Sequence, residues 1–482
     1  MFLLSQHARL PARRRAVSDA IQAVIADHAI EFVDLMYTDL LGGWHHLTLP
    51  ASRFDERLMA KGVGVDGSSV IGFRATKAGD MVLVPDLASH FLHPFSEHPT
   101  LCILGNLVDV GAREGFPRDP RFVARKAELR LAAEHPGVDS LWLPELEFFL
   151  FDSVEVWGQT GQAGYRLTSA EAGVVGGEPE VPTVSAHRKS YHAAAPEDRF
   201  ADVRSEMCRV LAKLNIPVKY HHHEVGCAGQ VEIELGFLPL GRAGDAVALA
   251  KWAIRMVAEQ YGLLATFMPK PLFGEPGSGL HFHQYLVRDG VSVFFDETGE
   301  GPLSPLGRCY VGGLLHHGRA LAALTNPSTN SYKRLVPGFE APVRLAYSVA
   351  NRTAAIRVPG YARSGEDVRI EYRPPDATCN PHIALAAMLM AGLDGIRRGL
   401  DPGPPLSGDI LALPPQQLAA VPALPASLAE ALDALEADHD FLLEGGVFTE
   451  DLLTTWIALK RAEAKDVAER PHPREFELYL GV

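Results

Sequence analysis

Ionisable side chains recur two residues apart in separate apolar segments of this chain. The three pairs are Glu145 and Glu147 in PELEFFLFD, His281 and His283 in GSGLHFHQYLV, and Glu371 and Arg373 in RIEYRPPD. Each segment is rich enough in apolar, β-branched or aromatic residues to predict a β-strand, in which residues i and i+2 share a face. A fourth segment, HHHEVGCAGQVEIEL, adds Glu224 and Glu232.

These acids are expected on inward-facing strand positions, where they would repel one another or lose their hydration unless a cation lay among them. Carboxylates with one imidazole favour Mg²⁺ or Mn²⁺ over zinc, which prefers more nitrogen and sulfur ligands. The alternative for any one strand is a row of solvated acids on an open sheet face. Four such segments together favour a divalent-metal cluster on a sheet.

The segment NPSTNSYKRLVPGFEAPVRLAYS carries Lys333, Arg334 and Glu340 around a Pro-Gly turn. A mobile loop of this kind can close over a reaction and deliver Glu340 as a late catalytic group. An ordinary surface loop is the alternative.

Four arginines fall in the strands that follow: Arg352, Arg357, Arg369 and Arg373. Arginines near acids are typical of clamps for nucleotide phosphates and for a phosphoryl group in transfer, although structural salt bridges would use the same residues. Together with the acids, they predict a site for phosphoryl transfer.

Composition narrows the classes of partner. The chain has 482 residues, of which 47% are hydrophobic and 22% charged, and a net charge of −14. This charge argues against nucleic acid or an anionic membrane as the main partner, since both are bound by clustered Lys and Arg. The five scattered cysteines form no CxxC pair, which favours a reducing cytoplasm without disulfides or zinc. No signal peptide or membrane span is evident, so we expect a cytoplasmic protein.

Two domains of unequal size are expected. Residues 1–112 combine a helix over 14–28, a hairpin formed by EFVDLMYTD and WHHLTLP, and further short strands and loops. The Pro-, Gly- and Arg-rich segment GAREGFPRDP is the candidate linker. Helical and strand patterns alternate through residues 113–482, in which the Gly- and Ser-rich stretch 155–190 is expected to form a long loop near the site.

Several long motifs resemble bacterial type I glutamine synthetases. They are VDGSSV, ELEFFLFD, HHHEVGCAGQVEIE, TFMPKPLFGEPGSGLHFH, NPSTNSYKRLVPGFEAP and RIEYRPPD, and the similarity continues to the closing HPREFELYLGV. The resemblance implies an α+β fold, with an N-terminal β-grasp domain and a larger catalytic domain whose curved antiparallel sheet is flanked by helices. It also implies a dodecamer of two stacked hexameric rings with active sites shared between subunits. The implied substrates are glutamate, ammonium and ATP, used with two or more Mg²⁺ or Mn²⁺ ions.

The family's site residues carry over by motif. Glu147, Glu224 and Glu232 resemble the ligands of a first metal, and Glu145, His281 and Glu371 those of a second. Glu147, Gly277, Arg334 and Arg373 resemble contacts to glutamate and to its phosphorylated intermediate. Arg352, Arg357 and Arg369 resemble nucleotide and phosphate contacts, with His283 near the phosphates and Phe237 near the adenine. Asp66 and Ser69 resemble the ammonium site, with Tyr191 near it, and Glu340 resembles the group that shields the intermediate from water.

Two positions depart from the family pattern. Pro276 stands where the family's substrate loop usually has asparagine. Proline has neither a side-chain amide nor a backbone N–H, so we expect weaker or altered amino-acid binding. Leu411 occupies the position where many relatives carry a tyrosine modified by adenylylation. Leucine has no hydroxyl, so this modification is not expected here.

Three alternatives stay open on sequence alone. The first is a ligase that joins glutamate to another amine, such as a polyamine, methylamine or ethanolamine. Retention of Asp66 favours ammonium, whereas Pro276 favours the other amines weakly. The second is a non-catalytic assembly protein, which the intact set of acids and arginines disfavours. The third, a guanidino kinase, would need neither the DGSS segment nor the Pro-Gly-Phe-Glu loop.

Overall fold

The computed structural model describes residues 12–74, 79–110, 115–171, 173–174, 189–298, 302–339, 341–408 and 410–481. The chain divides into two compact units, Met1–Phe122 and Val123–Val482. The predicted domain boundary at residues 112–113 stays a prediction, because residues 111–114 lie outside the described part.

The N-terminal unit is built on a mixed sheet with the strand order β2-β1-β6-β4-β3, and β5 pairs with β6. Its elements are α1 (Ala12–Asp27), β1 (Phe32–Thr38), β2 (Trp44–Pro50), α2 (Glu56–Lys61), β3 (Val63–Asp66), β4 (Asp80–Pro85), β5 (Phe91–Leu92) and β6 (Thr100–Asp109). The predicted hairpin is confirmed, since β1 and β2 are antiparallel. β1 also runs parallel to β6 at the centre of the sheet, as in a β-grasp domain.

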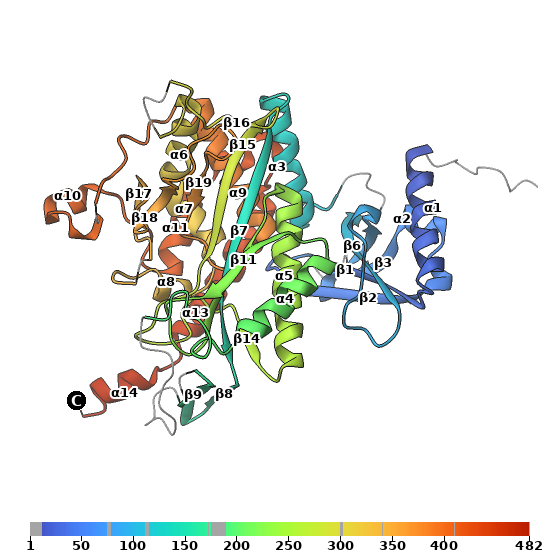
Figure 1. Cartoon of the computed structure of the whole chain (residues 1–482), viewed down its shortest axis with the longest axis horizontal. Coiled ribbons are helices and arrows are strands. Elements are labelled where there is room, and N and C mark those ends of the chain that lie inside the picture. The colour runs from blue at the N-terminus through green and yellow to red at the C-terminus, as the bar shows by residue number, and fades with distance from the viewer. Residues whose placement is uncertain are drawn as a thin grey trace, which may run out of the picture. The chain divides into compact units, whose positions relative to one another are not determined.

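The larger unit, Val123–Val482, contains a sheet of ten described strands, with the main order β11-β12-β7-β15-β19-β18-β17. Its strands are β7 (Asp139–Phe151), β11 (Val218–His223), β12 (Gln230–Leu235), β13 (Leu238–Pro239), β14 (Leu264–Thr266), β15 (Leu280–Arg288), β16 (Val291–Ser292), β17 (Arg344–Val349), β18 (Ala354–Val358) and β19 (Ile370–Tyr372). All pairs are antiparallel except β17 with β18. The long strands β7 and β15 lie side by side at the centre (Figure 1).

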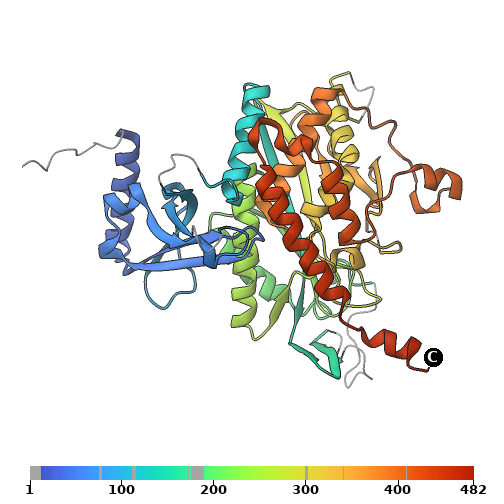
Figure 2. The same ribbon diagram turned by 180° about the vertical axis from the view of Figure 1, so that it is seen from behind.

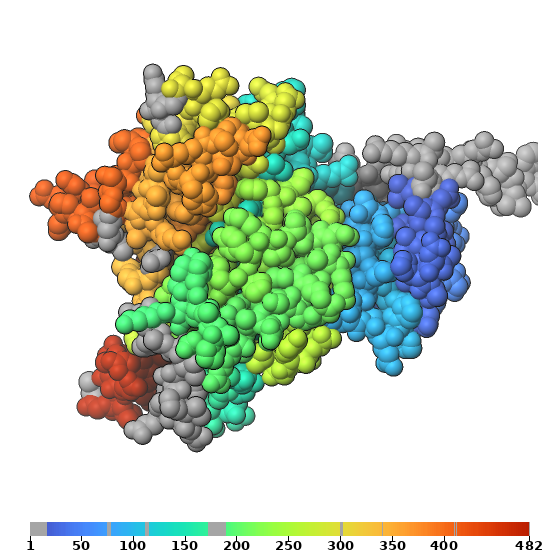
Figure 3. Space-filling model, in the orientation of Figure 1, coloured from blue at the N-terminus to red at the C-terminus, as the bar shows by residue number. Residues whose placement is uncertain are grey.

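Helices make up the rest of this unit, and the longer ones flank the sheet (Figure 1). They are α3 (Pro120–Glu134), α4 (Ala201–Lys213), α5 (Leu240–Gln260), α6 (Pro305–His316), α7 (Gly318–Thr325), α8 (Ser331–Arg334), α9 (Pro381–Arg398), α10 (Pro415–Ala420), α11 (Leu428–Ala437), α12 (Asp440–Leu443), α13 (Glu450–Ala468) and α14 (Pro473–Tyr479). Helix α5 packs on β7 and on α9, which is buried over most of its length. Helices α4 and α5 provide much of the green surface in Figure 3. The red helix α13 lies on the opposite side (Figure 2), where the indole N–H of Trp456 donates to the Ala323 carbonyl in α7 at 3.0 Å.

The expected long loop over 155–190 is wrong for its first half. Residues Ser153–Gln159 and Gln162–Ser169 form an antiparallel hairpin, β8 and β9, to which β10 (Gly173–Val174) adds. Much of this hairpin is exposed, with Val156 76% and Tyr165 58% accessible. Val154 and Val156 flank Glu155 and pair with Leu167 and Tyr165 across the hairpin, but this short alternation stands among glycines and charged residues, which favoured a loop. Residues 175–188 lie outside the described part.

The α+β fold predicted from the sequence is therefore confirmed. Within the described residues, no helix combines the length and the apolar character that a membrane crossing requires.

Candidate active site

Strand register places the predicted acids opposite one another. In the antiparallel pair of β7 and β12, Glu147 faces Glu232 and Glu145 faces Glu234. All four carboxylates are buried. Like charges directly opposite on neighbouring strands repel, so the sheet concentrates negative charge that a bound cation would offset.

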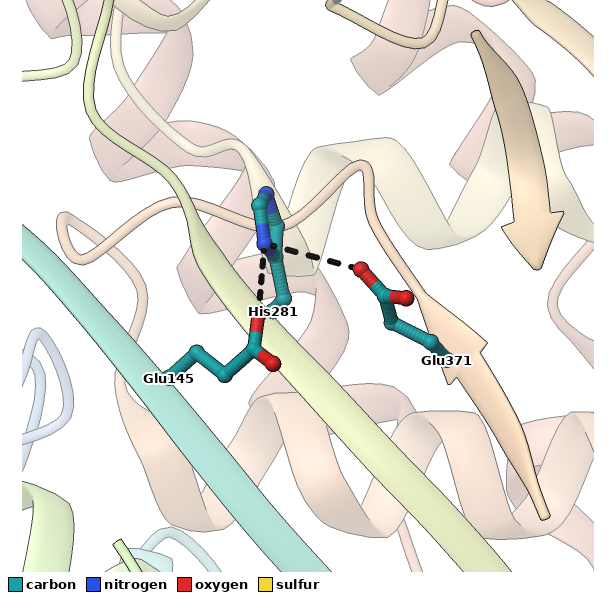
Figure 4. A group of neighbouring side chains, drawn as sticks. All are labelled: Glu145, His281 and Glu371. Carbon is teal, nitrogen blue, oxygen red and sulfur yellow. Dashed lines mark hydrogen bonds and ion pairs between the residues drawn. The ribbon is translucent and has the colours of Figure 1, made fainter. Parts of the chain in front are cut away.

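Three strands meet at one group of ligand atoms. Glu145 from β7, His281 from β15 and Glu371 from β19 offer atoms that lie within 4.8 Å of one another (Figure 4). His281 Nδ1 is 3.0 Å from Glu145 Oε2 and 3.8 Å from Glu371 Oε1. The guanidinium of Arg334 donates to His281 Nε2 at 3.3 Å. The set of two carboxylates and an imidazole fits a hard divalent cation.

A second group combines His222, Glu224 and Glu232, again with ligand atoms within 4.8 Å of one another. His222 Nε2 is 3.3 Å from Glu232 Oε1, and His222 Nδ1 is 3.6 Å from Glu224 Oε1. Burial and the neighbouring Glu147 and Glu232 raise the pKa of Glu224 well above its usual range. Burial together with Glu145 and Glu147 does the same for the pKa of Glu232. This charge repulsion is what a cation would relieve, so the group fits a divalent metal.

Glu147 lies between the two groups. Its Oε2 accepts the backbone N–H of Gly279 at 2.8 Å, and its Oε1 is 3.6 Å from His281 Nε2. His222 therefore lies with Glu224 and Glu232, and Glu147 binds the loop before β15, while the predicted role of Glu147 as a metal ligand stays a prediction.

Arginines neutralise the Glu145–His281–Glu371 group through Glu371. Arg357 and Arg373 both donate to the Glu371 carboxylate. Burial alone would raise the pKa of Glu371, but Arg373 lowers it to about 2. Likewise, burial opposes ionisation of Glu145, while His283 and His281 hold its pKa well below the usual range. Both acids are therefore ionised at neutral pH and available as ligands.

The substrate loop packs tightly beside these groups. The Gly277 carbonyl accepts from Gln230 Nε2 at 3.0 Å, and the Ser278 N–H donates to the Pro269 carbonyl at 2.8 Å. A Cβ on Gly277 would lie 2.4 Å from the Pro269 carbonyl oxygen, so only glycine fits this approach.

These groups line one cavity of about 310 Å³. Most of the predicted site residues line it: Glu145, Glu147, Tyr191, Glu224, Glu232, Gly277, His281, Arg334, Arg352, Arg357, Glu371 and Arg373. Pro276 also lines it, so the departure from the family pattern faces the site. Acids, imidazoles and arginines in one cavity suit a polyanionic substrate held through cations and guanidinium groups.

The remaining nucleotide candidates lie beside this cavity. His283 Nε2 is 2.7 Å from Glu145 Oε1. The Arg369 guanidinium lies 5.7 Å from the Phe237 ring centroid and 5.5 Å from that of Tyr361, which lines the cavity. Two aromatic faces around one guanidinium are compatible with binding a planar base.

Asp66 and Ser69 lie in the other compact unit. The Asp66 carboxylate accepts both the hydroxyl of Ser68 at 2.7 Å and that of Ser69 at 2.9 Å. Hydrogen bonds from Ser68 and Ser69 lower the pKa of Asp66, which keeps the carboxylate charged. The predicted catalytic residue Glu340 lies outside the described residues, as does the side chain of Leu411.

Two family models match the chain. Residues 117–479 match the glutamine synthetase catalytic domain, and residues 29–110 match the glutamine synthetase β-grasp domain. The chain belongs to the glutamine synthetase family. The glutamine synthetase of Frankia alni is 45% identical over 469 residues, which covers 95% of this chain and 98% of that protein.

Solved structures share this fold. A Plasmodium falciparum glutamine synthetase has a TM-score of 0.86 at 24% identity and covers 99% of both chains. A GmaS structure in complex with ADP has a TM-score of 0.80 at 29% identity and covers 95% of this chain and 99% of that one.

Two residues of strand β11 that the sequence analysis did not single out also belong to this site. His222 lies within a run of histidines, none of which stands out in the sequence. In the structure it lies opposite Glu232 in the β11–β12 pair, so the two side chains share one face of the sheet. Tyr220, two residues earlier, also lines the cavity. The alternation of residues along β11 was the signal for both.

Proposed function

We propose that this chain ligates glutamate and ammonia to glutamine at the expense of ATP, through γ-glutamyl phosphate. The observation that carries the proposal is the convergence of two carboxylate–imidazole groups and of Arg334, Arg352, Arg357 and Arg373 on one cavity. The family relationship and the 45% identity to a glutamine synthetase support the same reaction.

Two divalent cations, Mg²⁺ or Mn²⁺, are the proposed cofactors. Glu145, His281 and Glu371 would hold the cation beside the ATP phosphates, and Glu224 and Glu232, with Glu147 or His222, would hold the cation beside glutamate. When bound, the cations supply positive charge that offsets the developing charge on the phosphoryl oxygens.

The chain's own residues would position and protect the reactants. Arg334 and Arg373 bind the substrate carboxylates, with Gly277 allowing the close approach of the loop. Arg352 and Arg357 bind phosphate oxygens where they line the cavity. His283, Arg369 and Phe237 hold the nucleotide.

Asp66, which accepts the Ser69 hydroxyl, would attract ammonium and accept a proton from it, so that ammonia displaces phosphate from the acyl phosphate. Glu340 would shield this intermediate from water and accept the next proton. We further propose that the chain acts in the cytoplasm as a dodecamer of two stacked hexamers, with Asp66 supplied by a neighbouring subunit.

The decisive experiment is ATP-dependent phosphate release with glutamate, with ammonium compared against methylamine, ethanolamine and putrescine. We expect a strong preference for ammonium, with glutamine as the product. Preference for an organic amine would reassign the product while leaving the acyl-phosphate chemistry in place. No release with any amine would reject the proposal.

A further inference from the structure

Lys270 joins two walls of the cavity that come from distant parts of the sequence. Its backbone is held by Asn330, whose Oδ1 accepts the Lys270 N–H at 2.7 Å and whose Nδ2 donates to the Lys270 carbonyl at 3.1 Å. Asn330 directly precedes α8, which carries Arg334. The stem of Lys270 therefore starts from a point fixed beside the substrate-binding arginine.

The ammonium group of Lys270 reaches the substrate loop. It donates a hydrogen bond to the backbone carbonyl of Glu275, the residue that precedes Pro276. The Glu275 carboxylate in turn accepts the Cys227 backbone N–H at 3.1 Å, in the loop that follows Glu224. The bond to Lys270 thus holds the loop at the position where the family asparagine is replaced by proline.

The same ammonium group lies over an aromatic ring of the opposite wall. The Lys270 Nζ is 3.7 Å from the ring centroid of Phe339, which lines the cavity with Gly338 and Pro276. This distance is well inside the range of about 6 Å over which a cation is attracted to a ring face. An ammonium group is compact and has three N–H donors, so it can donate a hydrogen bond to a carbonyl and contact a ring face at the same time.

We propose that Lys270 is a positioning residue that holds Phe339 against the substrate loop and so closes the cavity to water while the acyl phosphate is present. The role rests on the proposed function, because water exclusion matters only if a hydrolysable intermediate forms. Loss of the charge releases Phe339 from the loop, and water then competes with ammonia for γ-glutamyl phosphate, giving glutamate and phosphate in place of glutamine and phosphate.

The test is the ratio of phosphate released to glutamine formed. In the wild type we expect a ratio close to one, with a small measurable excess of phosphate from hydrolysis. In Lys270→Met, which keeps the stem and removes the charge, we expect this excess to rise about fivefold, which corresponds to about 1 kcal/mol. Lys270→Arg should restore most of the coupling, and Lys126→Met is the matched control, because Lys126 also donates to a carbonyl, that of Gly446, at 2.7 Å.

Phe339 supplies a second test on the other partner. Phe339→Leu should uncouple the reaction as Lys270→Met does, the double variant should be no worse than either, and Phe339→Trp should stay coupled, because indole is the best partner for a cation. An unchanged excess of phosphate in Lys270→Met, or effects that multiply in the double variant, would overturn the role of Lys270.

Tryptophan fluorescence, which needs no turnover, tests the contact between Lys270 and residue 339 independently of the proposed function. In Phe339→Trp, adding Lys270→Met should shift the emission of the new tryptophan to the red, because its ring loses the contact and meets water. Unchanged emission would reject the contact. A wild type that forms no glutamine would reject the proposed function instead, whatever the emission shows.

Discussion

At the residue scale, Gly277 occupies a place where even a methyl group has no room. Its Cβ would lie 2.4 Å from the Pro269 carbonyl oxygen and 2.7 Å from Arg334 Cγ. We predict that Gly277→Ala displaces the Arg334 side chain and raises the KM for glutamate about tenfold. Gly158→Ala is the control, because a Cβ there meets nothing within 4 Å. Steady-state kinetics with glutamate varied would show the effect, and an unchanged KM would mean that the loop yields easily.

Pro276 lines the same cavity without a side-chain donor. A lost hydrogen bond to the substrate costs about 1–3 kcal/mol if nothing replaces it. We therefore predict that Pro276→Asn lowers the KM for glutamate, while the KM for ATP stays as it was. If both KM values are unaltered, another group already makes the contact, and Pro276 is a tolerated variation.

At the scale of elements, the ladder of β12, β7, β15 and β19 explains why so much of the site was predictable. Because residues two apart on a strand share a face, the sequence alone predicted that Glu145 and Glu147 lie on one face. The structure added which strands are neighbours. Arg373 follows the last residue of β19 and still forms an ion pair with Glu371, in keeping with their two-residue spacing. Lys270 was less predictable, since its partners Glu275 and Phe339 come together only through tertiary packing.

Helix α4 is anchored by a buried ion pair that supplies a stability prediction. Arg204, 2% exposed, donates to Asp198 Oδ1 at 2.9 Å and to Oδ2 at 2.5 Å. Burial opposes ionisation of Asp198, but Arg204 lowers its pKa below the usual value. We predict that Asp198→Asn lowers the free energy of unfolding by about 3 kcal/mol at pH 7, because a buried guanidinium loses its counter-charge.

The pH dependence of this effect follows from the lowered pKa. The carboxylate stabilises the fold fully above the unfolded-state pKa of about 3.9 and loses that effect as the pH falls through the lower folded-state pKa. The difference between wild type and Asp198→Asn should therefore shrink below about pH 4, in denaturant titrations from pH 3 to 7. Asp466→Asn, at an exposed pair with Arg470, should change little at any pH. A difference for Asp198→Asn that persists at pH 3 would show that charge pairing is not its cause.

At the scale of the whole molecule, the sequence predicted the fold class, but it could not predict how a complete site assembles. Asp66 belongs to the N-terminal unit, whereas the candidate metal-ligand groups belong to the larger unit. A sequence motif carries the identity of each residue but not the packing of one unit or subunit on another. That step depends on surface contacts, which have no periodic signature along the chain.

Helix α14 bears on assembly, because it exposes large apolar side chains. Phe476 is 57%, Leu478 50%, Tyr479 60% and Leu480 79% accessible. Apolar residues gathered on one short helix mark a surface that another protein surface covers. If the proposed dodecamer forms, a second copy of this chain is the partner, and deletion of residues 472–482 should lower the mass measured by light scattering. Phe476→Ser with Leu480→Ser should act in the same direction, since it removes the apolar contact and leaves the helix cap. An unchanged mass in both variants would place the subunit contacts elsewhere.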